Sequence, residues 1–207
     1  MARIVKSLTD RKSELISTAR HLFQTKGYDD VTMQDVMDTL GIAKGTIYHY
    51  FKSKEDLFEA VIESIVEANI NQMQTIVETR SGTALEKIKL LAQAGNISAE
   101  NANILQGLHQ PDTSALHSRI LASMITKQAT LYEQLIIQAC KEGIFTVNNP
   151  LECAELILAG IQFLTDKGIY PWSPEDLHRR AHAFPKLLEQ FLKAPTGSFD
   201  FMIPNNS

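Results

Sequence analysis

Seven consecutive residues, 44–50, carry the most specific chemistry in the chain. They run Lys-Gly-Thr-Ile-Tyr-His-Tyr, which places an ammonium group, three hydroxyls and an imidazole on two helical turns. Such groups donate hydrogen bonds to phosphates and base edges, and tyrosine rings can also contact thymine methyl groups. The segment is therefore predicted to lie in the major groove of DNA.

Two short helices joined by a tight turn must position these side chains. A helix is expected over residues 33–40, and Gly41 can end it because glycine adopts the left-handed conformation without a Cβ penalty. The chain then re-enters a helix near Lys44. Such a pair is a helix-turn-helix, whose second helix enters the groove.

The rest of the chain also follows a helical hydrophobic period, which predicts an all-α protein of about nine helices. A three-helix head is expected to hang from a long helix over 54–79 on a larger helical body. Pro185 predicts a kink or a split near Ala183 in the last helix. The remaining helices are expected over 10–26, 84–94, 99–108, 114–141, 151–166 and 174–192.

Composition and charge agree with a DNA-reading head on an acidic body. The chain has 207 residues, 44% of them hydrophobic, which is enough to bury a sizeable core. A net charge of −4 argues against indiscriminate coating of nucleic acid. Residues 1–55 hold nine Lys/Arg and seven Asp/Glu, against eleven and seventeen in the remainder. Positive charge thus concentrates around the helix-turn-helix.

Cysteine usage and hydropathy predict a cytoplasmic protein with no membrane partner. Cys140 and Cys153 belong to no CxxC or Cys/His spacing, which favours two reduced, buried thiols. The N-terminus has no signal-peptide apolar core, and the longest apolar stretch, 156–164, is too short to span a bilayer.

Catalysis and metal binding have little support in the sequence. The chain contains no GxSxG, GxxxxGK[ST], GxGxxG or HExxH motif, so we expect neither an enzyme nor a cofactor. His178 and His182 have the i, i+4 spacing of a metal face, but no nearby side chain completes a ligand set and no metal is expected. A structural adaptor would leave the aromatic, basic helix unexplained.

Ordinary structural roles compete with DNA contact at several of these positions. Tyr48 and Tyr50 could be core residues, although they cannot share the helix face of Ile47 and Phe51. Lysines 44 and 54 could be solvated charges, and Gln34 is evenly balanced between the two interpretations.

Residues 15–58 resemble the TetR family of transcriptional regulators. The resemblance rests on Ala19, Phe23 and Lys26-Gly27-Tyr28, on Thr32 with Asp35-Val36, on the run Gly41-Ile42-Ala43-Lys44-Gly45-Thr46-Ile47-Tyr48-His49-Tyr50-Phe51, and on Lys54-Glu55-Asp56-Leu57-Phe58. It implies a homodimeric repressor that binds a palindromic operator and releases it when a small hydrophobic ligand enters the helical body. The alternative is a DNA-binding regulator without such an effector, either an activator or an adaptor controlled by a protein partner.

The resemblance also implies a set of DNA contacts. They would be made by Thr32, Met33, Gln34, Lys44, Gly45, Thr46, Tyr48, His49, Tyr50 and Lys54. Ala43 departs from the family, where many members have Ser or Thr, and its missing hydroxyl removes an N-cap of about 1 kcal/mol.

Three further expectations concern the body. The last two helices are predicted to pair across a two-fold axis through Leu156, Ile157, Gly160, Ile161, Leu164, Leu177, Phe184, Leu187, Leu188 and Phe191. An effector pocket is predicted to be lined by Ile97, Leu105, Met124, Gln128, Tyr132 and Phe163. The domains are then 1–53 for DNA binding, 54–193 for effector binding and dimerisation, and a poorly ordered tail, 194–207, of which Phe199, Phe201 and Ile203 could still dock.

Overall fold

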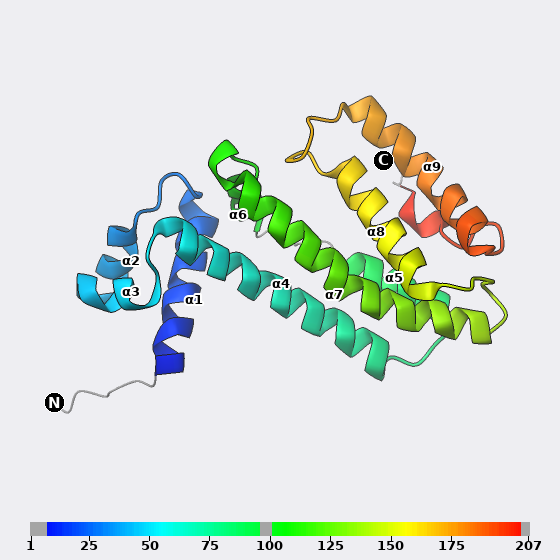
Figure 1. Ribbon diagram of the computed structural model, residues 1–207, viewed down its shortest axis with the longest axis horizontal. Helices are drawn as coiled ribbons and strands as arrows, with labels where there is room; N and C mark the ends of the chain where they lie inside the picture. The colour runs from blue at the N-terminus through cyan, green and yellow to red at the C-terminus, as the bar shows by residue number, and fades with distance from the viewer. Residues whose placement is uncertain (1–7, 96–100, 204–207) are drawn as a thin grey trace. The chain divides into compact units, whose positions relative to one another are not determined.

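The computed structural model describes residues 8–95 and 101–203, and all regular structure in these two ranges is helical (Figure 1). The elements are α1 (Leu8–Lys26), α2 (Met33–Leu40), α3 (Lys44–Tyr50), α4 (Lys54–Thr79), α5 (Ala84–Ala94), α6 (Ala102–Leu108), the 3-10 helix η2 (Pro111–Thr113), α7 (Ser114–Lys141), α8 (Pro150–Thr165), α9 (Pro174–Leu192) and the 3-10 helix η3 (Asp200–Met202). The predicted all-α class is confirmed. No helix within the two described ranges is long and apolar enough to cross a membrane.

Pro185 does not split the last helix, so of the kink or split predicted near Ala183 the split is wrong. Helix α9 runs continuously through Pro185, whose ring is buried. Packing of the ring and of the flanking turns thus outweighs the one backbone hydrogen bond that a proline removes.

The chain forms two compact units whose limits differ from the predicted boundary at residue 54. The first unit holds α1, α2, α3, the part of α4 up to Ala68, and α6 with its flanks up to His117. The second holds the rest of α4, α5, α7 from Ser118 onward, α8, α9 and the C-terminal segment. The sequence did not predict that α6 belongs with the head. Helix α6 is far from α1 along the chain and packs against it only in the folded protein.

Aromatic rings and a close helix contact hold the first unit together. Phe23 and Phe58 meet edge to face with ring centroids 5.1 Å apart, and Tyr28 lies 4.4 Å from Phe58. Helix α6 approaches this cluster at Gly107, where an added Cβ would lie 2.6 Å from the Tyr28 Cβ and 3.0 Å from the Phe58 Cζ. Glycine is therefore required at this position to let α6 pack on the head.

The core of the second unit is formed by α5, α7, α8, α9 and the end of α4. Met73, Leu91 and Ala139 are fully buried in it. Cys140 and Cys153 pack at its edge as free thiols that are half-buried rather than buried.

Arg180 fastens the end of α8 to the start of α9. Its guanidinium donates a 2.6 Å hydrogen bond to the Leu164 carbonyl and lies 3.9 Å from the ring centre of Trp172. The side chain is buried, so the carbonyl and the ring together replace part of its hydration. The contact keeps the two helices paired side by side.

The tail is not poorly ordered as far as residue 203, which corrects the sequence expectation. Phe199 is only 3% exposed and stacks on Phe145 at a centroid distance of 6.0 Å. The Gly197 amide donates a 2.7 Å hydrogen bond to Glu189, and η3 follows directly. Hydrophobic burial of Phe199 fixes a segment whose composition alone predicts a loop. Residues 204–207 lie outside the described ranges.

Candidate nucleic-acid interface

Helix α2 begins with a complete capping box. The Asp35 amide donates to the Thr32 hydroxyl at 3.2 Å, and the Thr32 amide donates to the Asp35 carboxylate at 2.8 Å. The Thr32 hydroxyl also donates to that carboxylate, and chiefly for this reason the pKa of Asp35 falls to about 2. Lys26 adds an ion pair at 3.3 Å, which ties α1 to α2. The start of α2 is therefore firmly placed.

The turn into α3 depends on Gly41 and lacks a side-chain cap. Gly41 adopts the left-handed conformation at φ 60°. Ala43 occupies the N-cap of α3 and makes no side-chain hydrogen bond, as its missing hydroxyl predicted. The Thr46 amide donates to the Ala43 carbonyl at 2.9 Å, so a backbone hydrogen bond closes the first turn of α3 and the Ala43 side chain adds none.

Helix α3 buries one face and exposes the other. Ile47 is fully buried and Phe51, just after the helix, is 2% exposed, so these two side chains anchor it. On the other side His49 is exposed, while Tyr48 and Tyr50 are half-exposed. The competing interpretation of the tyrosines as core residues is therefore not supported.

The starts of α2, α3 and α4 enclose a groove of about 380 Å³. It is lined by Val31, Thr32, Met33, Gln34, Met37, Lys44, Tyr48 and Lys54. Six of the ten predicted DNA-contacting residues thus meet in one hollow. The other four (Gly45, Thr46, His49 and Tyr50) lie on α3 itself.

Two residues that were predicted to contact DNA also make contacts within the first unit. The Met33 side chain is 9% exposed and packs in the core, so only its backbone is available at the start of α2. The Lys54 ammonium donates a 3.0 Å hydrogen bond to the Tyr28 carbonyl and lies 4.2 Å from the centre of the Tyr28 ring. Lys54 still lines the groove.

Sequence reasoning passed over Lys52, which follows α3 directly. Its side chain is exposed, and its ammonium donates to the Tyr48 carbonyl at 3.2 Å. The amide of Lys52 donates to Asp56 at 2.8 Å, which fixes the turn between α3 and α4. The signal that could have identified Lys52 as a candidate DNA contact is its basic side chain directly after the aromatic motif.

A second groove, of about 470 Å³, follows α8 and α9 in the other unit. It is lined by Leu156, Ile157, Gly160, Ile161, Leu164, Phe184, Leu187, Leu188, Gln190 and Phe191. Nine of the ten predicted interface residues are in this set, and only Leu177 is not. Leu156 is 64% exposed, Leu187 55% and Phe191 46%, whereas Leu188 also belongs to the core of its own unit.

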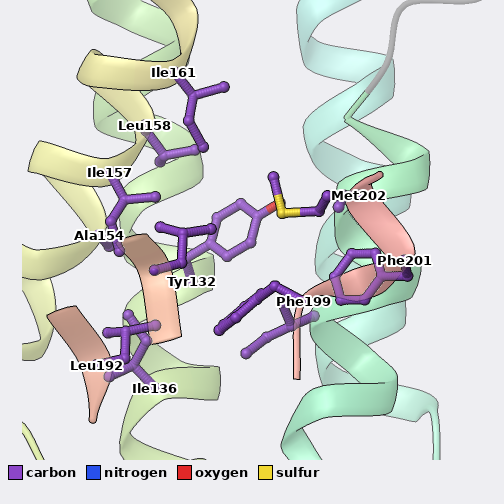
Figure 2. A pocket seen from close by; sticks show the side chains of 13 residues that line it. Tyr132, Ile136, Ala154, Ile157, Leu158, Ile161, Leu192, Phe199, Phe201 and Met202 are labelled. Atoms are coloured by element: carbon purple, nitrogen blue, oxygen red, sulfur yellow. The ribbon is translucent and has the colours of Figure 1, made fainter. Parts of the chain in front are cut away.

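A third hollow is an apolar pocket of about 70 Å³ within the second unit (Figure 2). It is lined by Ile88, Ala92, Tyr132, Ile136, Ala154, Ile157, Leu158, Ile161, Leu188, Leu192, Phe199, Phe201 and Met202. Tyr132 is the only lining residue with a polar side-chain oxygen or nitrogen. Burial raises the pKa of its hydroxyl well above the usual range, and no described residue forms a hydrogen bond with that hydroxyl.

Only Tyr132, of the six predicted effector-pocket residues, lines this pocket. Leu105 belongs to the other unit, and Phe163 is 55% exposed on α8. Met124 and Gln128 are buried on α7 but are not part of the pocket wall. Ile97 lies outside the described residues. Periodicity identifies the inward face of a helix but does not determine which inward residues border a cavity.

Gln128 is a buried amide side chain of the second unit, where Asn69 and Gln162 are half-buried amide side chains. Its Oε1 lies 3.5 Å from the Gln162 Nε2, while the Asn69 Nδ2 donates to the Ala94 carbonyl. The Gln162 Oε1 and the Asn69 Oδ1 have no hydrogen-bond partner among the described residues. They are unused acceptors in a largely apolar interior.

Two family profiles match the chain. Residues 15–61 match "Bacterial regulatory proteins, tetR family", and residues 96–187 match "Tetracyclin repressor-like, C-terminal domain". The first match contains the whole helix-turn-helix, and the second contains most of the body.

Curated relatives of the chain include transcriptional repressors. The chain is similar to the HTH-type transcriptional repressor KstR2 of Mycolicibacterium smegmatis, with 25% identity over 134 residues that span 65% of both chains. KstR2 of Mycobacterium tuberculosis is 25% identical over 149 residues, covering 70% of this chain and 74% of the relative. The repressor AcnR of Corynebacterium jeikeium is 43% identical over 51 residues, a quarter of this chain.

Solved structures share the fold. A transcriptional regulator from Cytophaga hutchinsonii superposes with a TM-score of 0.67 at 22% identity, covering 87% of this chain and 96% of that one. A TetR-family regulator from Pectobacterium atrosepticum gives a TM-score of 0.66 at 22% identity, covering 92% and 100%. The family and the curated relatives are regulators rather than enzymes, in agreement with the absence of catalytic motifs.

Proposed function

Because the chain belongs to the TetR family of bacterial regulatory proteins, we propose that it is a homodimeric repressor of transcription. In this proposal the dimer binds a palindromic operator and releases it when a small hydrophobic molecule binds the body. The choice of repressor rather than activator follows the names of the curated relatives. Because the operator is bacterial DNA, the proposal places the protein in the cytoplasm.

The groove at the starts of α2, α3 and α4 is the observation that carries the DNA-binding part. It gathers Lys44, Lys54, Thr32 and Gln34 around the exposed side of α3. Ammonium groups and helix amino ends bind phosphates, while polar side chains on a recognition helix reach base edges. The convergence of these groups on one hollow supports DNA binding at this face.

The apolar groove on α8 and α9 supports the homodimer. Large hydrophobic side chains at 46–64% exposure are unfavourable in water unless a partner covers them. A two-fold axis through this face buries the same residues from both copies. Two recognition helices would then meet half-sites one helical turn, roughly 34–36 Å, apart or a multiple of it.

The decisive experiment is selection of bound fragments from random double-stranded DNA by the full chain. We expect a palindrome whose half-sites are spaced by whole helical turns. Binding of a single, non-repeated half-site would contradict the dimer, and failure to enrich any sequence would contradict sequence-specific regulation.

The effector part rests on the apolar pocket and its single polar group. The Tyr132 hydroxyl can donate to a carbonyl or accept from a hydroxyl of a bound molecule. We expect 2-nonanone to raise the melting temperature of the protein and Tyr132→Phe to reduce its affinity about fivefold, the effect of removing one neutral hydrogen bond. Equal binding by both proteins would exclude Tyr132 as the anchor.

The small size of the pocket favours a second candidate, a regulator without a small-molecule effector. About 70 Å³ is well below the roughly 300–1,000 Å³ of typical ligand sites. If no apolar compound stabilises the protein while specific DNA binding persists, this second candidate is the correct one.

A further inference from the structure

The apolar pocket has one wall that differs from the others. Most of its wall comes from the helices α5, α7, α8 and α9, whereas Phe199, Phe201 and Met202 come from the C-terminal segment. Figure 2 shows Tyr132 reaching into the pocket, with Phe201 and Met202 on the side of the C-terminal segment. The first kind of wall belongs to long α-helices, whereas the second includes the three-residue 3-10 helix η3.

The C-terminal segment is anchored up to Phe199. The Gly197 amide donates to the buried Glu189 carboxylate at 2.7 Å, and Phe199 is buried against Phe145. Gly197 adopts φ 86°, so a backbone conformation that other residues rarely adopt precedes the anchor. These contacts fix where the segment enters the pocket wall.

Beyond Phe199 the backbone hydrogen bonds of the segment are local, while the side chains of Phe201 and Met202 pack against the core of the second unit. The Met202 amide donates to the Phe199 carbonyl at 3.0 Å and the Ile203 amide to the Asp200 carbonyl at 3.1 Å, both within one short 3-10 turn. Phe201 and Met202 are half-buried, as are Tyr132, Ile157 and Ile161 in the helical wall, whereas Ala154 and Leu192 are 2% and 3% exposed. Short 3-10 turns with half-exposed side chains open at low free-energy cost.

The volume of the pocket limits the size of the ligand that it can hold. A cavity of roughly 150 Å³ accommodates benzene, whereas this pocket has about 70 Å³. Phe201 and Met202 therefore fill space that an organic ligand of ordinary size requires. Movement of these two side chains beyond the fixed Phe199 would enlarge the pocket without disturbing its helices.

We propose that the segment Asp200–Met202 is a built-in gate of this pocket, in which Phe201 and Met202 occupy the position of an apolar ligand and are displaced when it binds. The inference rests on the proposed small-molecule response and adds its regulation. A ligand that binds only the open form has an apparent affinity reduced by the fraction of open molecules. The gate thus sets the ligand concentration at which the protein responds.

The test compares ligand binding with the gate present and removed. The probe is N-phenyl-1-naphthylamine, a neutral apolar dye whose fluorescence rises in an apolar site, titrated into the full-length protein. The double variant Phe201→Ala/Met202→Ala is expected to bind it at least about tenfold more tightly than the wild type, because the competing side chains are gone. Ile203→Ala, on the same segment but outside the pocket wall, is the matched control and should stay within twofold.

A third substitution locates the dye. Ala92 is a half-buried wall residue on α5, so Ala92→Phe in the double-variant background should fill the pocket and abolish the tenfold gain. An unchanged affinity in the double variant, an equal gain in Ile203→Ala, or a gain that survives Ala92→Phe would each overturn the gate. Gel shifts without dye measure DNA binding separately, so failure of the proposed repressor function would be distinguished from failure of the gate.

Discussion

The groove of the first unit and the groove along α8 and α9 expose opposite chemistry. The first combines two lysines with hydroxyl and amide groups beside three aliphatic side chains, and the second consists of leucine, isoleucine and phenylalanine with one glycine and one glutamine. Polar groups on a short helix suit a hydrated, charged partner such as DNA, whereas an apolar helix pair suits a second protein surface. Helices of one chain can therefore suit different kinds of partner, because the side chains on their exposed faces differ.

Two glycines make the same contrast testable. An added Cβ at Gly45 on α3, or at Gly160 on α8, would meet no atom within 4 Å, so both positions are open inside the monomer. A substitution at either site therefore reports on an external partner rather than on the fold. Gly107 is the opposite case, because its neighbours leave no room for a side chain.

The largest effect is expected for Gly160→Glu. A carboxylate in the apolar groove must be desolvated against its symmetry copy, so the variant should sediment as a monomer and its operator affinity should fall at least about 100-fold with the second half-site no longer engaged. Gly160→Ala is the control and should remain dimeric. A dimeric Gly160→Glu protein would show that the interface lies elsewhere.

A smaller effect on DNA binding is expected for Lys44→Gln. Removing one lysine–phosphate interaction lowers the slope of log affinity against log salt by about 0.9, so two copies in a dimer should lower it by nearly 2. Gel shifts at several salt concentrations measure the slope, and the dimer should persist. Lys89→Gln, at an exposed lysine on α5, should leave the slope unchanged. Equal slopes for wild type and Lys44→Gln would remove Lys44 from the interface.

A stability difference should separate Gly107→Ala from Gly160→Ala. The first overpacks α6 against Tyr28 and Phe58 and should destabilise the protein by about 1–3 kcal/mol. The second replaces glycine in an open helical position and should stabilise it by about 0.5–1 kcal/mol. Thermal unfolding followed by circular dichroism compares both with the wild type. A destabilised Gly160→Ala would mean that the partner copy packs too closely on Gly160 to leave room for a methyl group.

The smallest effect is the pH dependence carried by Asp35. Its pKa falls from about 3.9 in an unfolded chain to about 2 in the folded protein, so its stabilising contribution is present above pH 4 and is lost as the pH falls through 2. The melting temperature of Asp35→Asn should lie slightly below that of the wild type at pH 6. The two curves should converge near pH 2, and a constant gap across this range would assign the effect to something other than ionisation.

Local signals in the sequence predicted most helix boundaries of the described ranges. The start of α2 was predicted from Thr32 and Asp35, and its end from Gly41, because caps and stops depend on neighbours in sequence. Nine of the ten residues expected on the α8–α9 face meet in one groove because helical periodicity alone sets which side chains share a face.

Long-range packing decided what periodicity could not. The assignment of α6 to the head depends on the space at Gly107 beside Tyr28, and the order of the tail depends on Phe199 stacking on Phe145. In the pocket only Tyr132 was anticipated, since Phe199 and Met202 reach it from a segment whose sequence resembles a loop. The sequence by itself determined helices, caps and polar or apolar faces, which depend on residues within a few turns. The tertiary structure alone decided which distant residues share a cavity, because only the folded chain brings them into contact.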